Sequence, residues 1–272
     1  AKAEKQLSRS LEKVDLIIEV RDARIPLATS HPHLDKWIEG KKHLLIVNRR
    51  DMISDEAFQD WDRWMRGQGH QPWWCDAKKG TGVKQIQEAA IRSGNDLNER
   101  RQSRGMKSRP IRALTLGFPN VGKSALINRL VRKKAVASSR RAGVTRALHW
   151  VRLGQALDLL DAPGVLPPRL DDQESALLLA LCDDIGQAAY DIELVAISFL
   201  EKLQGLIGLN HSSINVNLLE TRYGVPFRGS PYLWLTTAAE RHTSSNTERM
   251  AQRLIDDFRK GMLGLISLEL PK

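Results

Sequence analysis

The sequence has few cysteines and no long apolar run, and one stretch has no acidic side chain. Cys75 and Cys182 are the only cysteines among 272 residues, which excludes a disulfide framework and favours a reducing, intracellular setting. No apolar run approaches the roughly 20 residues that a membrane-spanning helix needs, so no membrane span is predicted. Hydrophobic residues still make up 42% of the chain, which is enough for a core and excludes wholesale disorder.

Acidic residues are missing altogether from residues 100–157, which carry 15 Lys and Arg side chains. The formal net charge of the whole chain is +10, so this one stretch holds more than the entire excess. On an ordinary protein surface, basic side chains pair with acidic ones in salt bridges, and such a surface gives no reason for a long stretch without Asp or Glu. We therefore expect a strongly positive surface that attracts a polyanion, with RNA the first candidate beyond the phosphates of a nucleotide.

Short apolar runs alternate with helical stretches over the first 168 residues. Strands are predicted at residues 14–20, 43–47, 72–75, 111–116, 148–153 and 157–160, and helices at about 30–40, 54–68, 83–92 and 123–132. This alternation predicts a mostly parallel sheet with helices on both faces. Residues 94–110 are polar and basic, and they are predicted to form an exposed linker inside this α/β domain.

The character of the sequence changes after Pro167 and Pro168. Helical periodicity then marks residues 173–182, 191–207, 212–222 and 245–260, so a small all-α domain is predicted over residues 169–272. Ser245, with Glu248 three residues later, matches a capping box at the start of the last of these helices.

The strongest functional motif is Gly117-Phe-Pro-Asn-Val-Gly122-Lys123-Ser124, which follows a predicted strand and opens a predicted helix. This is the setting of a phosphate-binding loop, in which glycines let backbone N–H groups converge on phosphate oxygens at a helix N-terminus. Lys123 is predicted to reach the β and γ phosphates, and Ser124 to ligate Mg²⁺. The predicted nucleotide-binding residues of this segment are Asn120, Val121, Gly122, Lys123, Ser124 and Ala125.

Two further segments fit a site for a nucleoside triphosphate. Asp161-Ala-Pro-Gly164 begins 38 residues after Lys123, at the end of a predicted strand. Asp161 suits a Mg²⁺ site, and the N–H of Gly164 is placed to sense the γ phosphate, as in a nucleotide switch. Thr145, in Gly143-Val-Thr145, offers a second hydroxyl to Mg²⁺, so Lys123, Thr145 and Gly164 are the predicted catalytic residues. A plain turn or helix cap is the competing interpretation of both segments.

The base is predicted from two segments that follow strands. Asn48-Arg49-Arg50-Asp51 resembles the Asn-Lys-x-Asp guanine reader of GTPases, and an Asp51 carboxylate accepts from N1 and the 2-amino group of guanine, a donor pair that adenine lacks. The long stem of Arg49 is expected to lie along the base. Asp76-Ala77-Lys78 resembles a Ser-Ala-Lys element, whose Ala N–H donates to guanine O6. Helix capping is the alternative interpretation of the Asn and Asp residues.

The base-reading segments precede the phosphate loop, whereas ordinary GTPases have them after it. All the pieces remain at strand ends, so one site can be built from a circularly permuted chain, because termini often lie close together at the surface. The segment after Gly164 then leads directly into the helical domain. A loop that tightens around the γ phosphate would therefore pull on that domain.

In this order, the motifs resemble the circularly permuted GTPases of the YlqF/RbgA group, ribosome biogenesis GTPase A, over nearly the whole chain. Asp22-Ala-Arg-Ile-Pro26 resembles the group's signature after the first strand, and Gly143–Arg146 and Asp161–Gly164 resemble its switch motifs. The resemblance implies a circularly permuted P-loop GTPase domain over residues 1–168, with GTP or GDP as ligand, and then the helical domain.

The resemblance also implies a biological setting. The protein it implies is a bacterial cytoplasmic or organellar factor that acts late in assembly of the large ribosomal subunit. The helical domain would contact ribosomal RNA, and the subunit would stimulate GTP hydrolysis. Ribosomal proteins are possible further partners, and we expect the protein itself to be a monomer.

The sequence departs from the usual GTPase pattern at several positions. Arg49 and Asp76 replace the usual Lys and Ser, and Val165 stands where many GTPases have a Gln that orients water. The family's Pro-Gly-His-Met segment, whose His is proposed to help position that water, is not among residues 1–272. The resemblance places Asn120 at a potassium-binding position, with simple loop geometry as the alternative.

We therefore expect slow basal hydrolysis that rises with potassium and with the large subunit. A GTP-gated placeholder without catalytic function, or a GTPase of another RNA-related process such as tRNA modification, remain alternatives.

Overall fold

The structure, a computed structural model, describes residues 10–131, 149–162, 172–183, 190–209, 215 and 217–271. These residues form two compact units, one within residues 1–50 and 64–169 and the other within 51–63 and 170–272. Residues 51–63 are predicted to belong to the first domain, whereas their contacts group them with the C-terminal helices. Within the described ranges, no helix has the length and apolar character to cross a bilayer.

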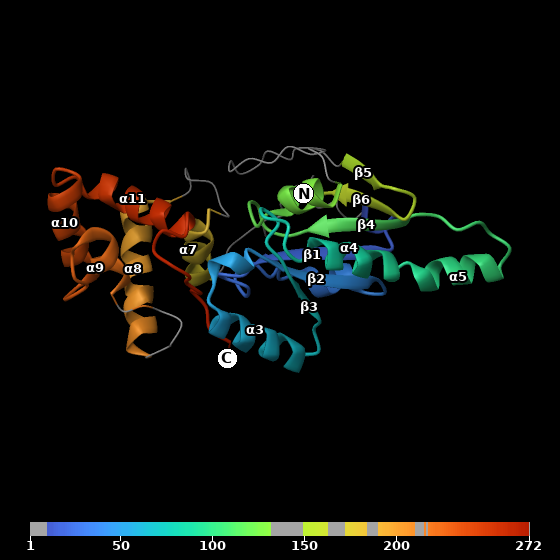
Figure 1. Cartoon of the computed structure of the whole chain (residues 1–272), viewed down its shortest axis with the longest axis horizontal. Coiled ribbons are helices and arrows are strands. Elements are labelled where there is room, and N and C mark those ends of the chain that lie inside the picture. Colours follow the sequence, from blue (N-terminus) through green and yellow to red (C-terminus); the bar gives the residue numbers. More distant parts are fainter. Residues whose placement is uncertain are drawn as a thin grey trace. The chain divides into compact units, whose positions relative to one another are not determined.

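A six-stranded sheet of described residues forms the centre of the first unit (Figure 1). The strands lie in the order β3-β2-β1-β4-β6-β5, with β1 at Leu16–Asp22, β2 at Lys42–Asn48, β3 at Pro72–Trp74, β4 at Ile111–Leu116, β5 at His149–Leu153 and β6 at Leu157–Asp161. Each pair of neighbours is parallel except the hairpin of β5 and β6. The predicted mostly parallel sheet is confirmed, and so is the pairing of the last two strands.

Helices follow most of these strands. They are α2 (Leu34–Ile38), the 3-10 turn η1 (Arg50–Met52), α3 (Asp55–Gly67), α4 (Val83–Arg92), α5 (Asn95–Ser103) and α6 (Lys123–Val131). Helix α6 contacts α4 and the hairpin strands β5 and β6. The predictions for α3, α4 and α6 are confirmed to within about a residue at each end, whereas α2 is shorter than the predicted 30–40.

The linker predicted at residues 94–110 is wrong over its first part, because Asn95–Ser103 forms helix α5. No residue of α5 is buried, so the helix has no apolar face from which helical periodicity could be recognised. The segment after α5 is tied back to it, since Asn98 Nδ2 donates to Arg109 O at 3.1 Å and Asn98 Oδ1 accepts from Arg109 N at 3.0 Å.

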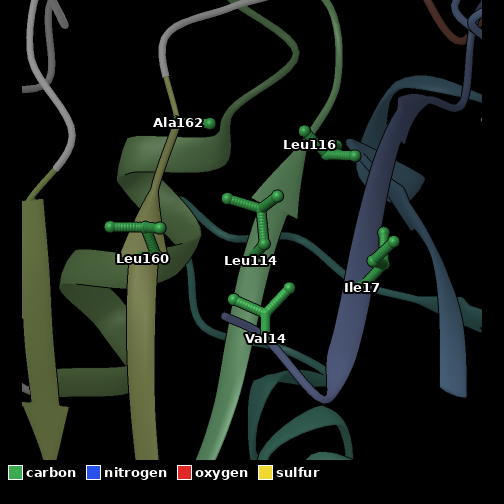
Figure 2. Packing of buried hydrophobic residues seen from close by; sticks show 6 residues of the cluster. All are labelled: Val14, Ile17, Leu114, Leu116, Leu160 and Ala162. Carbon is green, nitrogen blue, oxygen red and sulfur yellow. The ribbon is translucent and has the colours of Figure 1, made fainter. Parts of the chain in front are cut away.

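Apolar side chains on one face of the sheet form a continuous core (Figure 2). The cluster joins residues of β1, β4 and β6 to the segment before β1, and comprises Val14, Ile17, Leu114, Leu116, Leu160 and Ala162. Leu11 and the α2 residues Trp37 and Ile38 pack against it. This burial fixes the strands whose carboxyl ends carry the predicted motifs.

The second unit is helical. Its helices are α7 (Gln173–Leu181), α8 (Ile192–Gly208), α9 (Leu218–Tyr223), α10 (Pro231–His242) and α11 (Thr247–Arg259). Helix α8 contacts α7, α10 and α11, and the rings of Phe199 and Phe258 lie 4.9 Å apart between α8 and α11. Residues 51–63 join this unit through Trp61, whose Nε1 donates to Ser267 Oγ at 3.2 Å.

Helix α10 is not among the helices predicted from the sequence, and the cap of α11 lies one residue after its predicted position. Helix α10 carries a readable signal, because Ser230 caps it by accepting from Leu233 N and Pro231 occupies its first turn. The predicted capping box at Ser245 is wrong. Ser245 has φ +63°, and Asn246 caps α11 instead, its side chain accepting from Arg249 N at 2.8 Å. An N-cap needs an extended backbone, which Asn246 has and Ser245 lacks.

Candidate functional site

The loop between β4 and α6 has two positions that only glycine can occupy. Gly117 has φ +149°, and a Cβ there would lie 2.4 Å from Val20 O. Gly122 has φ +101°, and a Cβ there would lie 2.1 Å from Asn48 Nδ2. At both glycines the backbone of the predicted phosphate loop therefore lies closer to its neighbour than a side chain would allow, as in the glycine-rich turns that bind phosphate.

Lys123 begins α6 and is nearly buried, with 6% of its surface exposed. Its Nζ donates to Gly117 O at 2.9 Å and to Phe118 O at 2.6 Å. The ammonium group is thus held against the loop that is predicted to bind phosphate. Ser124 and Ala125 follow in the first turn of α6, where backbone N–H groups lack partners within the helix.

Asn48 joins the predicted phosphate loop to the second segment that is predicted to read the base. It is buried at the carboxyl end of β2, and its Nδ2 donates to Val121 O at 2.8 Å. Its Oδ1 accepts from Ala77 N at 3.0 Å, and Cys75 Sγ lies 3.5 Å from the same oxygen. Three segments far apart in the sequence therefore meet at one side-chain amide.

The Asp76-Ala77-Lys78 segment forms a closed turn after β3. Asp76 Oδ1 accepts from the backbone N of Lys78 at 2.8 Å and of Lys79 at 3.0 Å, and Asp76 O accepts from Gly80 N at 2.7 Å. The N–H of Ala77 already donates to Asn48 Oδ1. To contact guanine O6, this N–H has to be shared between Asn48 Oδ1 and the base, or to leave Asn48 for the base. The base contact of Ala77 stays a prediction.

Arg129 of α6 holds this turn from the other side. Its Nη2 donates to Lys78 O, and its Nε lies 3.5 Å from Ala77 O. Gly80 leaves room for the guanidinium, since a Cβ there would lie 3.1 Å from Arg129 Nε. Sequence reasoning did not single out Arg129, because nothing in the sequence shows that the helix after the phosphate loop reaches the turn after β3.

Arg49 has φ +63° and reaches two neighbours. Its Nη2 donates to Asn120 O at 2.8 Å, and its Nε lies 3.1 Å from Asp22 Oδ2. Asp22 ends β1 opposite Asn48 of β2 and is fully buried. The head of Arg49 therefore lies between the end of β1 and the phosphate loop. Whether its stem also lies along a base stays a prediction.

Asp22 is the anchor of this group. Its Oδ1 accepts from Arg24 N at 2.9 Å and Nε at 3.0 Å, and its Oδ2 accepts from Arg24 Nη2 at 2.7 Å. Burial raises the pKa of Asp22, but the charges of Arg24 and Arg49 outweigh it and hold the pKa below its usual value. From the sequence, Asp22–Pro26 is recognisable only as a signature of the resemblance. The structure shows a buried carboxylate that holds two arginines.

The remaining predicted site residues lie at a strand end, in segments that follow strands, or outside the described residues. Asp161 ends β6, fully buried and in register with Thr115 of β4. Asn120 has φ +60° in the phosphate loop. Asp51 lies in η1 and groups by contact with the second unit. Thr145, Gly164 and the neighbouring Val165 lie outside the described residues.

The first unit has one edge that collects these motifs. Asp22, Asn48 and Asp161 end parallel strands, and the phosphate loop and the turn at Asp76 follow two more. The carboxyl edge of an open α/β sheet is where such folds bind ligands. The predicted base-reading segments reach this edge before the phosphate loop in chain order, the reverse of the order in an ordinary P-loop GTPase.

Comparison with known proteins gives concordant matches. The model of the family described as 50S ribosome-binding GTPase matches residues 112–208. The ribosome biogenesis GTPase A of Bacillus cereus is 36% identical over 205 residues, which cover 74% of this chain and 69% of that protein. The protein of the same name from Priestia megaterium is 36% identical over 204 residues, which cover 75% and 71%.

A mitochondrial relative and a solved structure extend the comparison. Mitochondrial ribosome-associated GTPase 1 of Ictalurus punctatus is 34% identical over 197 residues, which cover 68% of this chain and 60% of that protein. The crystal structure of GNP-bound YlqF from T. maritima superposes with a TM-score of 0.64 at 21% identity and covers 100% of this chain and 99% of that one. On this identity and coverage, and with the P-loop GTPase fold in common, the chain belongs to the ribosome biogenesis GTPase A family.

Proposed function

We propose that this protein binds and hydrolyses GTP and acts in assembly of the large ribosomal subunit. The observation that carries the proposal is the junction at Asn48, which bonds to Val121 of the phosphate loop and to Ala77 of the turn after β3. A guanine nucleotide has to span a phosphate site and a base site. Family membership supplies the ribosomal setting, because the relatives are named for ribosome biogenesis.

The roles of the nucleotide-binding residues follow from their places in the fold. Gly122, Lys123 and Ser124 would hold the phosphates with the backbone of Asn120, Val121 and Ala125. Asn48 would keep the phosphate loop and the base turn in register, and Arg49 would fix the loop at Asn120. Asp51 would read the two donors of guanine, while Asp76, Ala77 and Lys78 would close the base side.

The donor chemistry fits a magnesium ion. Ser124 offers a hydroxyl in the first turn of α6, and Asp161 offers a carboxylate at the end of β6, both hard oxygen ligands of the kind that Mg²⁺ prefers. Thr145 would add a second hydroxyl. When bound, the ion neutralises charge on the β and γ phosphates. Asn120 would hold a potassium ion beside them through its side-chain amide oxygen, because its backbone carbonyl accepts from Arg49.

We propose that GTP hydrolysis is slow in the isolated protein and is stimulated by the ribosomal subunit. The chain has Val165 where a water-orienting Gln is usual in GTPases, and a valine side chain cannot orient water by hydrogen bonding. A group from the subunit would then complete the site. The helical domain of residues 169–272 would contact ribosomal RNA, and Gly164 would couple the γ phosphate to that domain.

Two alternatives keep the same nucleotide site. In the first, the protein is a GTP-gated placeholder whose turnover is incidental, which the absence of a Gln at position 165 favours. In the second, it serves another RNA-related process such as tRNA modification. The first predicts that hydrolysis does not respond to ribosomal particles, and the second predicts no preference for the large subunit.

The decisive experiment combines binding with turnover. The full-length chain is sedimented with purified small and large subunits in GDP and in a non-hydrolysable GTP analogue, and GTP hydrolysis is measured with each subunit in sodium and in potassium. We expect binding to the large subunit in the GTP-like state and faster hydrolysis with that subunit and with potassium. Equal rates in all these conditions, or equal binding to both subunits, would contradict the proposal.

A further inference from the structure

The hairpin of β5 and β6 carries a tryptophan on its exposed face. Trp150 of β5 is 48% exposed, whereas Trp61 and Trp234 are essentially buried. Its neighbours in the strand, Val151 and Leu153, are 8% and 7% exposed. The alternation along β5 therefore points Val151 and Leu153 into the core and leaves Trp150 at the surface.

An arginine lies over this tryptophan. The guanidinium carbon of Arg112, an exposed residue of β4, is 5.9 Å from the centroid of the Trp150 ring. This distance lies within the range of a cation–π contact. A lone exposed aromatic side chain needs no explanation, but an aromatic ring paired with a cation is a recurring feature of surfaces that bind nucleic acid strands.

The sheet register places a second arginine beside them. Arg112 of β4 pairs with Asp158 of β6, and Asp158 pairs with Arg152 of β5, so the three side chains form a row across the sheet. In the adjacent row Leu114, Leu160 and Trp150 are partners. The side chain of Arg152 is 79% exposed, with its Nε 3.4 Å from Asp158 Oδ1. Two cations of this row face one carboxylate. Asp15 also accepts from Arg112 N at 2.9 Å, but it is paired with Arg109, so the row keeps a positive charge.

The charge of the surrounding sequence decides what kind of partner this surface suits. Arg112, Trp150 and Arg152 all belong to residues 100–157, in which the sequence has no Asp or Glu. Asp158 is the first acid after that stretch. An acidic polymer with planar groups matches both the ring and the charge. A single-stranded RNA offers both, because its unpaired bases stack on aromatic rings while its phosphates meet arginine.

We propose that Trp150, Arg112 and Arg152 form a contact site for an unpaired segment of RNA, with one base stacked on Trp150. The site is distinct from the nucleotide site, since its side chains lie on a face of the sheet and Trp150 meets Arg112, the second residue of β4, at the end of that strand opposite to the phosphate loop. The proposal rests on the proposed role in ribosome assembly for its partner, and it adds the kind of RNA and the surface that meets it.

The test uses the full-length chain and a fluorescent oligouridine of about 12 nucleotides, in the range of site sizes for such strands. Trp150→Ala should weaken its binding by about 5- to 20-fold, the effect of losing one stacked base. Trp150→Tyr should restore most of the affinity, because a smaller ring still stacks. A duplex RNA of the same length should lose less than two-fold in Trp150→Ala, because its bases cannot reach the ring.

Arg112→Gln tests the charge separately. The slope of log affinity against log salt should fall by about 0.7 for the loss of one phosphate contact to a single strand. Arg92→Gln removes an exposed arginine of α4 and is the matched control for charge. This control should bind oligouridine as the unaltered protein does.

Three results would overturn the site. The first is unchanged oligouridine binding in Trp150→Ala and Arg112→Gln. The second is an equal loss of affinity for single-stranded and duplex RNA in Trp150→Ala. The third is an equal loss of affinity for a poly-glutamate peptide, which would indicate an acidic protein partner. Fluorescent GDP binding and the thermal unfolding midpoint are measured for every variant and should stay unchanged. Failure of the unaltered protein to bind GDP would overturn the proposed GTPase, whereas normal GDP binding without RNA binding would overturn only this site.

Discussion

Asn48 and Val121 lie 73 positions apart in the sequence, and the side-chain Nδ2 of Asn48 donates a 2.8 Å hydrogen bond to the backbone oxygen of Val121. This bond runs from the end of β2 to the phosphate loop. Oδ1 of the same side chain accepts from Ala77 N–H. The amide nitrogen of Asn48 therefore holds the phosphate side of the proposed nucleotide site, and the amide oxygen holds the base side. Because Asn48 is buried, water cannot replace either bond.

Asn48→Ala should therefore weaken nucleotide binding as well as stability. Leaving a buried carbonyl and a buried N–H without partners costs about 1–3 kcal/mol each in stability. Nucleotide affinity should fall by about 2- to 13-fold if half of one such cost appears in the bound state. Affinity is measured by titration of fluorescent GDP, and stability by urea unfolding.

Asn98→Ala is the matched control for this change. Asn98 also bonds through both ends of its amide to backbone groups, but it does so between α5 and Arg109, away from the carboxyl edge of the sheet. The control should lose stability and keep its affinity for GDP. An equal fall of affinity in both variants would mean that Asn48 acts only through general stability.

Asp51→Asn should move the preference of the base site from GTP towards XTP. A carboxylate accepts from the N1 and 2-amino donors of guanine, while an amide can donate to the 2-oxo group of xanthine. We expect a loss of GTP affinity of at least about ten-fold together with a gain for XTP. Competitive titration with the two nucleotides measures both, with Asp55→Asn, at an exposed position of α3, as control. Unchanged GTP affinity would remove Asp51 from the base site.

The sequence predicted the fold well where apolar periodicity and turn chemistry agree. The strand before Gly117 and the helix after it are found within a residue or so of their predicted positions, because a buried strand, a glycine turn and an amphipathic helix each leave a signal. Helix α5 has no apolar face and left none. The cap of α11 was misplaced by one residue, because a left-handed backbone at Ser245 cannot be recognised in a non-glycine residue.

The candidate site could be predicted only as motifs. Asn48, Gly117 and Lys123 are recognisable from their spacing and setting. The contact of Arg129 with the turn at Lys78 and the anchoring of Arg49 by Asp22 could not be predicted, since both join segments whose distance depends on the order of the strands. Long-range pairing of this kind is set by packing of the whole sheet and not by local sequence.

Lys123→Ala should reduce affinity for the phosphates and not for the base. The ammonium group is held by two carbonyl oxygens of its own loop, at Gly117 and Phe118, within reach of the turn that is predicted to hold phosphate. GDP and GTP affinity should fall by at least about ten-fold, the loss of one charge-assisted contact. Affinity for guanosine, which has no phosphate, should stay the same. A parallel loss for guanosine would show that the loop has collapsed.

The stability of the first unit should depend on pH through Glu19. This carboxylate is buried in β1, with Arg21 Nε at 2.6 Å from its Oε1 and His43 Nε2 at 3.1 Å from its Oε2. Burial raises the pKa of Glu19, but the hydrogen bond with His43 and the charge of Arg21 outweigh it and hold the pKa below its usual value of 4.5.

A lowered pKa means that the unfolded chain binds the proton more readily than the folded chain does. The stabilisation by Glu19 is therefore complete above pH 4.5 and is lost as the pH falls through the lowered value. Glu19→Gln should cost about 3–5 kcal/mol at pH 7, because Arg21 keeps a buried charge without its partner. It should also flatten the acid limb of a urea unfolding series. Glu99→Gln, at an exposed position of α5, should leave that limb unchanged.

Gly117→Ala should destroy the phosphate loop, and Gly154→Ala shows how much of the effect is due to backbone strain alone. Both glycines have positive φ, +149° and +61°, so alanine is strained at either position, at a cost of about 1–2 kcal/mol. Only at Gly117 would the new Cβ meet the backbone, 2.4 Å from Val20 O, whereas at Gly154 nothing lies within 4 Å. Because Val20 belongs to the fully buried β1, it cannot move aside.

We expect Gly154→Ala to bind GDP normally with slightly reduced stability, and Gly117→Ala to lose GDP binding by more than about 100-fold or to fail to fold. Normal GDP affinity in Gly117→Ala would show that this loop does not bind the phosphates.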